Sequence, residues 1–107
     1  MRARRARPED AAWVYSLIAR YAAEGLLLPR SEEEIRAHIG RFLVLVEEDA
    51  GVKRRLGCVA LEPYGADLAE IRSLAVDPDA RGRGFGARLL QAALRAARRR
   101  KIRRVFA

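Results

Sequence analysis

Three glycines and two arginines within six residues could together bind a phosphate group. Residues 81–86 follow an apolar stretch and an Asp-Pro-Asp turn, and a helical pattern begins directly after them. Glycine lets the backbone approach a ligand closely because it has no Cβ. The amides of a first helical turn have no intrahelical acceptor and lie at the positive end of the helix dipole. This arrangement predicts an anion site, suited above all to a phosphate or pyrophosphate.

Three phosphate-binding motifs compete for this segment. A Walker loop requires Gly-Lys-Ser or Gly-Lys-Thr, which the chain lacks. The dinucleotide fingerprint fits Gly82, Gly84 and Ala87, but it needs an acidic residue ~20 positions later, where this chain has none. The pattern Q/R-x-x-G-x-G/A is met by Arg81, Gly84 and Gly86, with a helix following at once. A glycine-rich turn without a ligand is the remaining interpretation.

Composition limits the class of protein. With 107 residues, 50% hydrophobic and 34% charged, the chain is typical of one globular domain spanning 1–107. No apolar run approaches the ~20 residues of a membrane helix. The N-terminus also lacks the apolar region of a signal peptide. We therefore expect a cytoplasmic protein without a membrane partner.

The net charge of +8 raises the question of nucleic-acid binding, since 20 of the 22 basic residues are arginine. The chain also has 20 alanines and neither asparagine nor threonine, a skew typical of a GC-rich coding sequence. The basic run 95–104 falls at a predicted helix end, where cations complement the dipole, and no aromatic residues are interleaved there for stacking. We interpret the run as a solvated helix end, with an RNA-binding arm as the alternative.

The single cysteine and single histidine exclude an internal disulfide and a four-ligand zinc site. Cys58 lies in an apolar strand pattern and is predicted to be a buried, inert thiol rather than a nucleophile. His38 lies in a polar helical segment without a nearby serine or cysteine partner, which favours a surface position. We therefore expect no metal and no catalytic triad.

The remaining patterns place the glycine segment in a fold. Residues 1–7 read at best as an edge strand, and an amphipathic helix is expected between Pro8 and Gly25. Ser31 and Glu34 form a capping box for a shorter helix. Strands are predicted at 42–48, 56–64, 71–76 and 102–107, with a polar hairpin at 49–55 and a helix from 86 that buries Leu90. The predicted order is β-α-α-β-β-β-α-β.

The glycine pattern in this order of elements resembles the acetyl-CoA site of the GNAT superfamily of N-acetyltransferases. The resemblance covers essentially the whole chain and implies an α/β (α+β) fold, a mixed central sheet flanked by helices. It implies acetyl-CoA as cosubstrate, with the pantetheine arm on the backbone of the strand and the pyrophosphate on the amides of the glycine loop. The residues expected at the cofactor are Leu74, Ala75, Val76, Arg81, Gly82, Arg83, Gly84, Phe85, Gly86 and Ala87.

Four blocks, EGLLLPRSEEEI, FLVLVEE, GCVALEPYG and AEIRSLAVDPDARGRGFGARLL, resemble the acetyltransferase domain of bacterial N-acetylglutamate synthases. This implies transfer of an acetyl group to glutamate in arginine biosynthesis. It also implies that Arg30 holds the substrate carboxylate, which suits the planar fork of a guanidinium. The alternative is an ordinary exposed loop arginine. Glu62 is a departure, because some family members have lysine or an aromatic residue there.

Glu70 is the candidate general base. Amide formation needs a neutral amine, and a carboxylate near the cleft can accept the amine's proton directly or through water. Its position before the glycine loop also matches the base of the histone-acetylating branch. The alternative is a solvent-facing strand glutamate.

A complete GNAT domain continues with another helix and two strands, often carrying a tyrosine acid. Tyr15, Tyr21 and Tyr64 all precede the cofactor loop, so none matches that acid. We therefore expect a domain truncated after its fifth strand. Two other functions stay open: a GNAT acetyltransferase with another amine acceptor, and a non-catalytic CoA-binding or assembly module, homodimeric through an open sheet edge.

Overall fold

The elements follow one another in the predicted order in the computed structural model, which describes all of residues 1–107. They are β1 (Arg2–Arg5), α1 (Ala11–Ala23), α2 (Glu32–Ala37), β2 (Phe42–Asp49), β3 (Val52–Pro63), β4 (Leu68–Val76), α3 (Phe85–Arg99) and β5 (Arg104–Phe106). Single 3-10 turns lie at Pro8–Asp10, Ile39–Arg41 and Pro78–Ala80. None of the helices combines the length and the apolar character needed to cross a bilayer.

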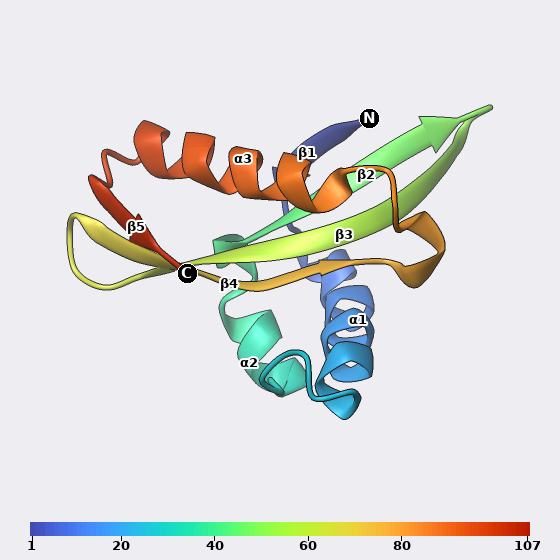
Figure 1. The fold of residues 1–107 in the computed structure, drawn as a ribbon, viewed down its shortest axis with the longest axis horizontal. Helices are drawn as coiled ribbons and strands as arrows, with labels where there is room; N and C mark the ends of the chain where they lie inside the picture. Colours follow the sequence, from blue (N-terminus) through green and yellow to red (C-terminus); the bar gives the residue numbers. More distant parts are fainter.

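The five strands form one mixed sheet in the order β1-β2-β3-β4-β5. The first four are antiparallel to their neighbours, and β5 runs parallel to β4. Helix α3 covers one face of the sheet, and α1 and α2 cover the other (Figure 1). Side chains of β3 alternate between the two resulting cores: Val59 and Leu61 pack toward α3, and Cys58 and Ala60 toward α1 and α2. The predicted fold class is confirmed.

The hairpin between β2 and β3 is tighter than predicted. The strands continue to a two-residue turn at Ala50 and Gly51, both with positive φ, as type I′ hairpins require. Opposite charges face each other across the ladder, with Glu48 opposite Lys53. Such cross-strand pairs favour strand pairing, so the polar residues that suggested a loop lie within the strands instead.

Helix α3 presents a different face to the sheet from the one predicted. It begins at Phe85, and its buried stripe contains Leu89. Leu90, which we expected in the core, is 37% exposed. The buried face of α3 packs against Gly57 of β3. A Cβ at this position would come within 2.7 Å of the Ala75 carbonyl oxygen and 2.8 Å of Leu89 Cδ1. Glycine at this position therefore allows the helix and the sheet to approach each other.

Gly57→Ala is accordingly expected to destabilise the protein by about 1–3 kcal/mol, the usual cost of overpacking a core. For a domain of this size that corresponds to a Tm lower by several degrees, measurable by calorimetry or circular dichroism. Gly40→Ala is the matched control, because a Cβ at Gly40 meets nothing within 4 Å and φ there is not positive. Equal Tm values for the two variants would contradict this packing argument.

Strand β4 carries a bulge next to its open edge. Cys58 of β3 pairs with Ala75 and Ala60 pairs with Arg72, so Ser73 and Leu74 together oppose one β3 residue. Ser73 has a φ of 55°, which an L-residue rarely adopts. Beyond Glu70, β4 has no strand partner on its β5 side, since β5 pairs only with Leu68 through Glu70. Bulges often lie beside functional sites because they reorient backbone groups and side chains.

Candidate functional site

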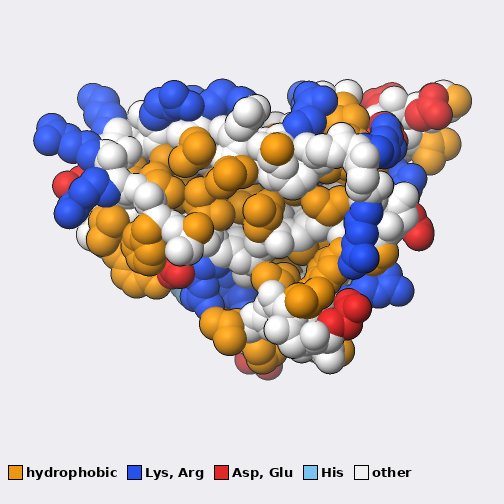
Figure 2. Space-filling view, in the orientation of Figure 1, with side chains coloured by type: hydrophobic (Ala, Val, Ile, Leu, Met, Phe, Trp, Pro, Cys, Tyr) orange, Lys and Arg blue, Asp and Glu red, His pale blue; other side chains and the backbone are white.

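A groove of about 440 Å³ follows this open edge. Its walls are β4 from Glu70 to Leu74, the α1–α2 loop at residues 26–28, Leu90 of α3 and the last residue, Ala107. Hydrophobic side chains gather between α3 and the helices α1 and α2 on this side of the molecule (Figure 2). The volume lies within the usual range for small-molecule sites. Exposure of Leu90 is therefore explained by its place in the groove wall.

The glycine loop leaves backbone amides free at the start of α3. Gly84 is the N-cap, with φ 79°, and no side chain caps the helix. The first intrahelical bond of the backbone is donated by the Arg88 amide to the Gly84 carbonyl at 3.3 Å. The three preceding amides, of Phe85, Gly86 and Ala87, thus have no intrahelical acceptor.

Space beside these amides fits an anionic ligand. A Cβ built on Gly82, Gly84 or Gly86 would meet no atom within 4 Å, so ligand atoms can approach the backbone there. A pyrophosphate of CoA would bind to the amides at the positive end of α3. The residues present therefore fit the cofactor that the loop predicts.

The loop arginines are engaged with other side chains. Arg81 donates from Nε and Nη2 to the Tyr21 hydroxyl at 3.0 and 2.7 Å, and its guanidinium carbon lies 5.1 Å from the centre of that ring. The Tyr21 hydroxyl in turn donates to the Val76 carbonyl at 2.6 Å. Arg83 lies over Phe85 and pairs with Glu47 at 3.1 Å. Tyr21, which in the sequence was notable only as a tyrosine that precedes the loop, thus joins α1 to the end of β4 and to the loop.

Arg30 is buried in an ion network rather than exposed. It is 6% exposed and donates from Nη2 to Glu62 at 2.6 Å and to Glu34 at 2.8 Å. Nη1 donates to the Ser73 hydroxyl at 3.2 Å. The interpretation of Arg30 as an ordinary exposed loop arginine is therefore wrong. Arg30 is not part of the groove wall, but its hydrogen-bond partner Ser73 is.

Glu62 explains why that network is stable. Its second carboxylate oxygen accepts a bond from Arg41 Nη1 at 3.1 Å. Burial alone would raise the pKa of Glu62, but the hydrogen bonds and charges of Arg30 and Arg41 outweigh it and hold the pKa below its usual range. Glu62 is thus an ionised partner of both Arg30 and Arg41.

Glu70 lies in the groove wall, opposite Glu62 in the β3–β4 register. Its Oε1 accepts a hydrogen bond from the Tyr64 hydroxyl at 2.9 Å, and this bond raises the pKa of Tyr64. No protein group donates to Oε2. Glu70 therefore has one oxygen oriented by Tyr64 and the other available to a ligand.

Arg72, two residues along β4, was missed in the sequence. It lines the groove, and no carboxylate lies within ion-pair distance of it. The two-residue spacing from Glu70 places both side chains on one face of the strand, which the sequence pattern could have indicated.

Cys58 and His38 lie where the sequence predicted them. Cys58 is buried, and desolvation raises the pKa of its thiol to about 12, so it stays protonated near neutral pH. His38 is exposed at the end of α2. No three His, Cys, Asp or Glu side chains gather in a way that could hold a metal ion.

Residues 8–107 match the Acetyltransferase (GNAT) family, and the chain belongs to that family. Among curated relatives, the amino-acid acetyltransferase of Neisseria meningitidis is 39% identical over 105 residues, which is 97% of this chain and 23% of the relative. The amino-acid acetyltransferase of Mycobacterium tuberculosis is 35% identical over 103 residues, covering 96% of this chain and 58% of the relative. The chain thus spans only part of the length of these relatives.

Solved structures agree with the family. A Mycobacterium tuberculosis protein in complex with CoA and NLQ superposes with a TM-score of 0.88 at 32% identity, over 98% of this chain and 62% of that one. The N-acetylglutamate synthase of Neisseria gonorrhoeae, in complex with coenzyme A and N-acetylglutamate, has a TM-score of 0.84 at 37% identity, over 94% of this chain and 23% of that one. The resemblance to the acetyltransferase domain of N-acetylglutamate synthases is confirmed.

Proposed function

We propose that this domain transfers the acetyl group of acetyl-CoA to the α-amine of an amino acid, with L-glutamate as the preferred acceptor, in the cytoplasm and in arginine biosynthesis. One observation carries the proposal. Strand β4 borders the groove with a carboxylate, Glu70, at one end, and leads at the other into the free amides of α3. A thioester bound along this strand would present its carbonyl to an amine next to Glu70.

Acetyl-CoA supplies the activated acyl group, and the chain supplies binding and proton acceptance. The amides of Phe85, Gly86 and Ala87 hold the pyrophosphate, and the backbone of residues 74–76 holds the pantetheine arm. The carbonyl of Val76 already accepts a hydrogen bond from the Tyr21 hydroxyl, so this carbonyl can bind the pantetheine arm only through its remaining lone pair. Glu70 Oε2 accepts the proton of the amine as its nitrogen bonds to the acetyl carbon and the C–S bond breaks.

Two arginines are proposed to bind the carboxylates of the acceptor. Arg72 is the cation without an acidic partner in the groove wall. Arg30 is already paired, but one of its partners, Glu34, has a 44% exposed side chain. A substrate carboxylate could replace the exposed Glu34 at the guanidinium, whereas the buried Glu62 stays in place.

The test is an assay of thiol release from acetyl-CoA by the complete gene product with a panel of amines. We expect glutamate to be preferred over polyamines, aminoglycosides and peptides with free N-termini. A preference for one of those acceptors would support a GNAT acetyltransferase of other specificity. CoA binding without turnover on any amine would favour the non-catalytic module instead.

Arg72→Gln is expected to raise KM for glutamate by about tenfold or more, because a hydrogen bond to a charged group contributes about 1.5–3 kcal/mol. The value of kcat and the affinity for CoA should change little, since Arg72 does not contact the reacting atoms in this arrangement. Arg98→Gln is the control: it removes one charge from the exposed face of α3, away from the groove. An unchanged KM in Arg72→Gln would exclude Arg72 from substrate binding.

A further inference from the structure

A cavity of about 490 Å³ lies between β1 and the β2–β3 hairpin. It shares no residue with the groove along β4 or with the glycine loop. Six of its ten lining residues are basic: Arg2, Arg4, Arg7, Lys53, Arg54 and Arg55. Two, Glu9 and Glu48, are acidic. The proposed acetyl transfer uses none of these residues.

A buried carboxylate holds two of the arginines in place. Asp10 is fully buried. Its carboxylate accepts hydrogen bonds from both terminal nitrogens of Arg4, at 2.8 and 3.2 Å, and from Nε of Arg55 at 2.8 Å. The Arg7 amide donates a fourth bond to it at 2.7 Å. Burial would raise the pKa of Asp10, but these bonds outweigh it and hold the pKa far below its usual range. Two of the lining arginines, Arg4 and Arg55, are therefore oriented by one carboxylate that stays ionised near neutral pH.

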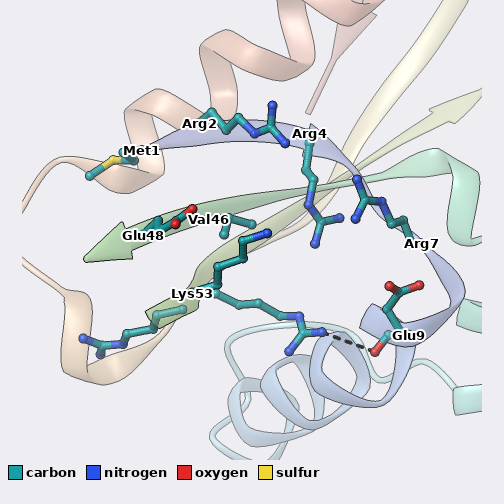
Figure 3. Close-up of a pocket in the computed structure, with 10 residues that line it drawn as sticks. Met1, Arg2, Arg4, Arg7, Glu9, Val46, Glu48 and Lys53 are labelled. Carbon is teal, nitrogen blue, oxygen red and sulfur yellow. Dashed lines mark hydrogen bonds between the residues drawn. The ribbon is translucent and has the colours of Figure 1, made fainter. Parts of the chain in front are cut away.

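The other cations of this cavity make no close ion pair, although Glu48 faces Lys53 across the β2–β3 ladder. Arg2, Arg7, Lys53 and Arg54 form no ion pair, whereas Arg36 and Arg83 elsewhere on the surface each contact a glutamate. Side chains of Arg4 and Arg7 reach into the same space as Lys53, which comes from the opposite wall (Figure 3). Six cations against Glu9, Glu48 and Asp10 leave an excess of three positive charges.

We propose that this cavity binds an oligophosphate, the di- or triphosphate group of a nucleotide or of inorganic polyphosphate. Such a group carries about three or more negative charges near neutral pH, because each phosphate contributes between one and two, and this matches the excess. Guanidinium forks bind phosphate oxygens in pairs, and an ammonium adds a point charge. The volume lies in the range of small-molecule sites.

The lining also favours phosphates over bases. No aromatic residue lines the cavity, so a nucleic-acid base would find no ring to stack on. Recognition therefore depends on phosphate oxygens, which a triphosphate presents in a compact group. A single-stranded nucleic acid would gain only the diffuse attraction of a basic surface.

Isothermal titration calorimetry of the complete gene product with inorganic tripolyphosphate, in low salt and with saturating CoA, tests the proposal. We expect one site, and affinity lower by about fivefold or more in both Lys53→Gln and Arg7→Gln, since each removes an unpaired cation. The control Arg98→Gln removes one charge from the far end of α3 and should bind normally. ATP in place of tripolyphosphate distinguishes the sources: tighter binding of ATP indicates a nucleotide, and equal binding indicates the phosphate chain alone.

Four results would overturn the inference. Tripolyphosphate displaced by CoA would place it at the glycine loop. Equal weakening in all three variants would show a diffuse charge effect. Absence of tripolyphosphate binding at low salt would exclude an oligophosphate site. So would a single-stranded RNA oligonucleotide that binds tightly and outcompetes tripolyphosphate. Circular dichroism confirms that the variants are folded, which we expect because Arg7 and Lys53 are exposed.

Discussion

Glu70→Gln is expected to lower kcat for acetyl transfer to glutamate by roughly 10²-fold or more at neutral pH, the usual range for loss of a general base. Affinity for CoA should stay within about twofold, because the proposed contacts to CoA are made by backbone groups. The deficit should shrink as pH rises, since more of the free amine is then already neutral. Steady-state kinetics across pH, with CoA binding measured by calorimetry, checks each of these outcomes.

Tyr64→Phe is the matched control for that experiment. It removes the 2.9 Å hydrogen bond to Glu70 Oε1 but leaves the carboxylate in the groove. We expect a much smaller loss of kcat, because the carboxylate still accepts the proton. An unchanged kcat in Glu70→Gln at neutral pH would remove Glu70 from the mechanism and leave water or the substrate's own carboxylate as the acceptor.

Gly86→Asp is expected to weaken CoA binding by roughly 10²-fold while the fold survives. Two unit charges about 6 Å apart repel by about 2.8 kcal/mol at an effective dielectric constant of 20, which corresponds to that factor. A Cβ at Gly86 meets no atom within 4 Å and φ there is not positive, so the substitution is sterically tolerated. An acidic residue in the first turn of α3 should even stabilise the helix slightly.

Gly86→Asn separates charge from size in this experiment. It has nearly the volume of aspartate without the negative charge, and we expect it to bind CoA better than Gly86→Asp. Gly84→Asp should also weaken CoA binding, but φ at Gly84 is 79°, so backbone strain would contribute there. Wild-type CoA affinity in Gly86→Asp would mean that the loop is structural only. Arg81 should matter less than the amides, because Tyr21 already occupies its guanidinium.

Local signals account for what the sequence by itself predicted. The glycine loop, the Ser31 N-cap of α2, the strand of Cys58 and the order of all eight elements each depend on residues close together in the chain. The capping box expected at α2 forms only in half, because the Glu34 side chain pairs with Arg30. The GNAT fold and the acetyl-CoA site were predicted from the resemblance of these motifs, taken in their order, to that family. Short-range errors arose where the local pattern fitted two assignments: α3 buries Leu89 instead of Leu90, and the β2–β3 strands extend through residues expected in a loop.

Tertiary structure alone decided the contacts between distant residues. Arg30 is buried because it meets Glu62, 32 residues away, and Arg81 is held by Tyr21, 60 residues away. Arg4 of β1 and Arg55 of β3 are joined by the Asp10 carboxylate, 6 and 45 residues away from them in the chain. Spacing and periodicity indicate which face of a helix or strand a residue occupies. They do not indicate which distant residue it contacts, because burial and charge pairing depend on how the sheet and helices pack.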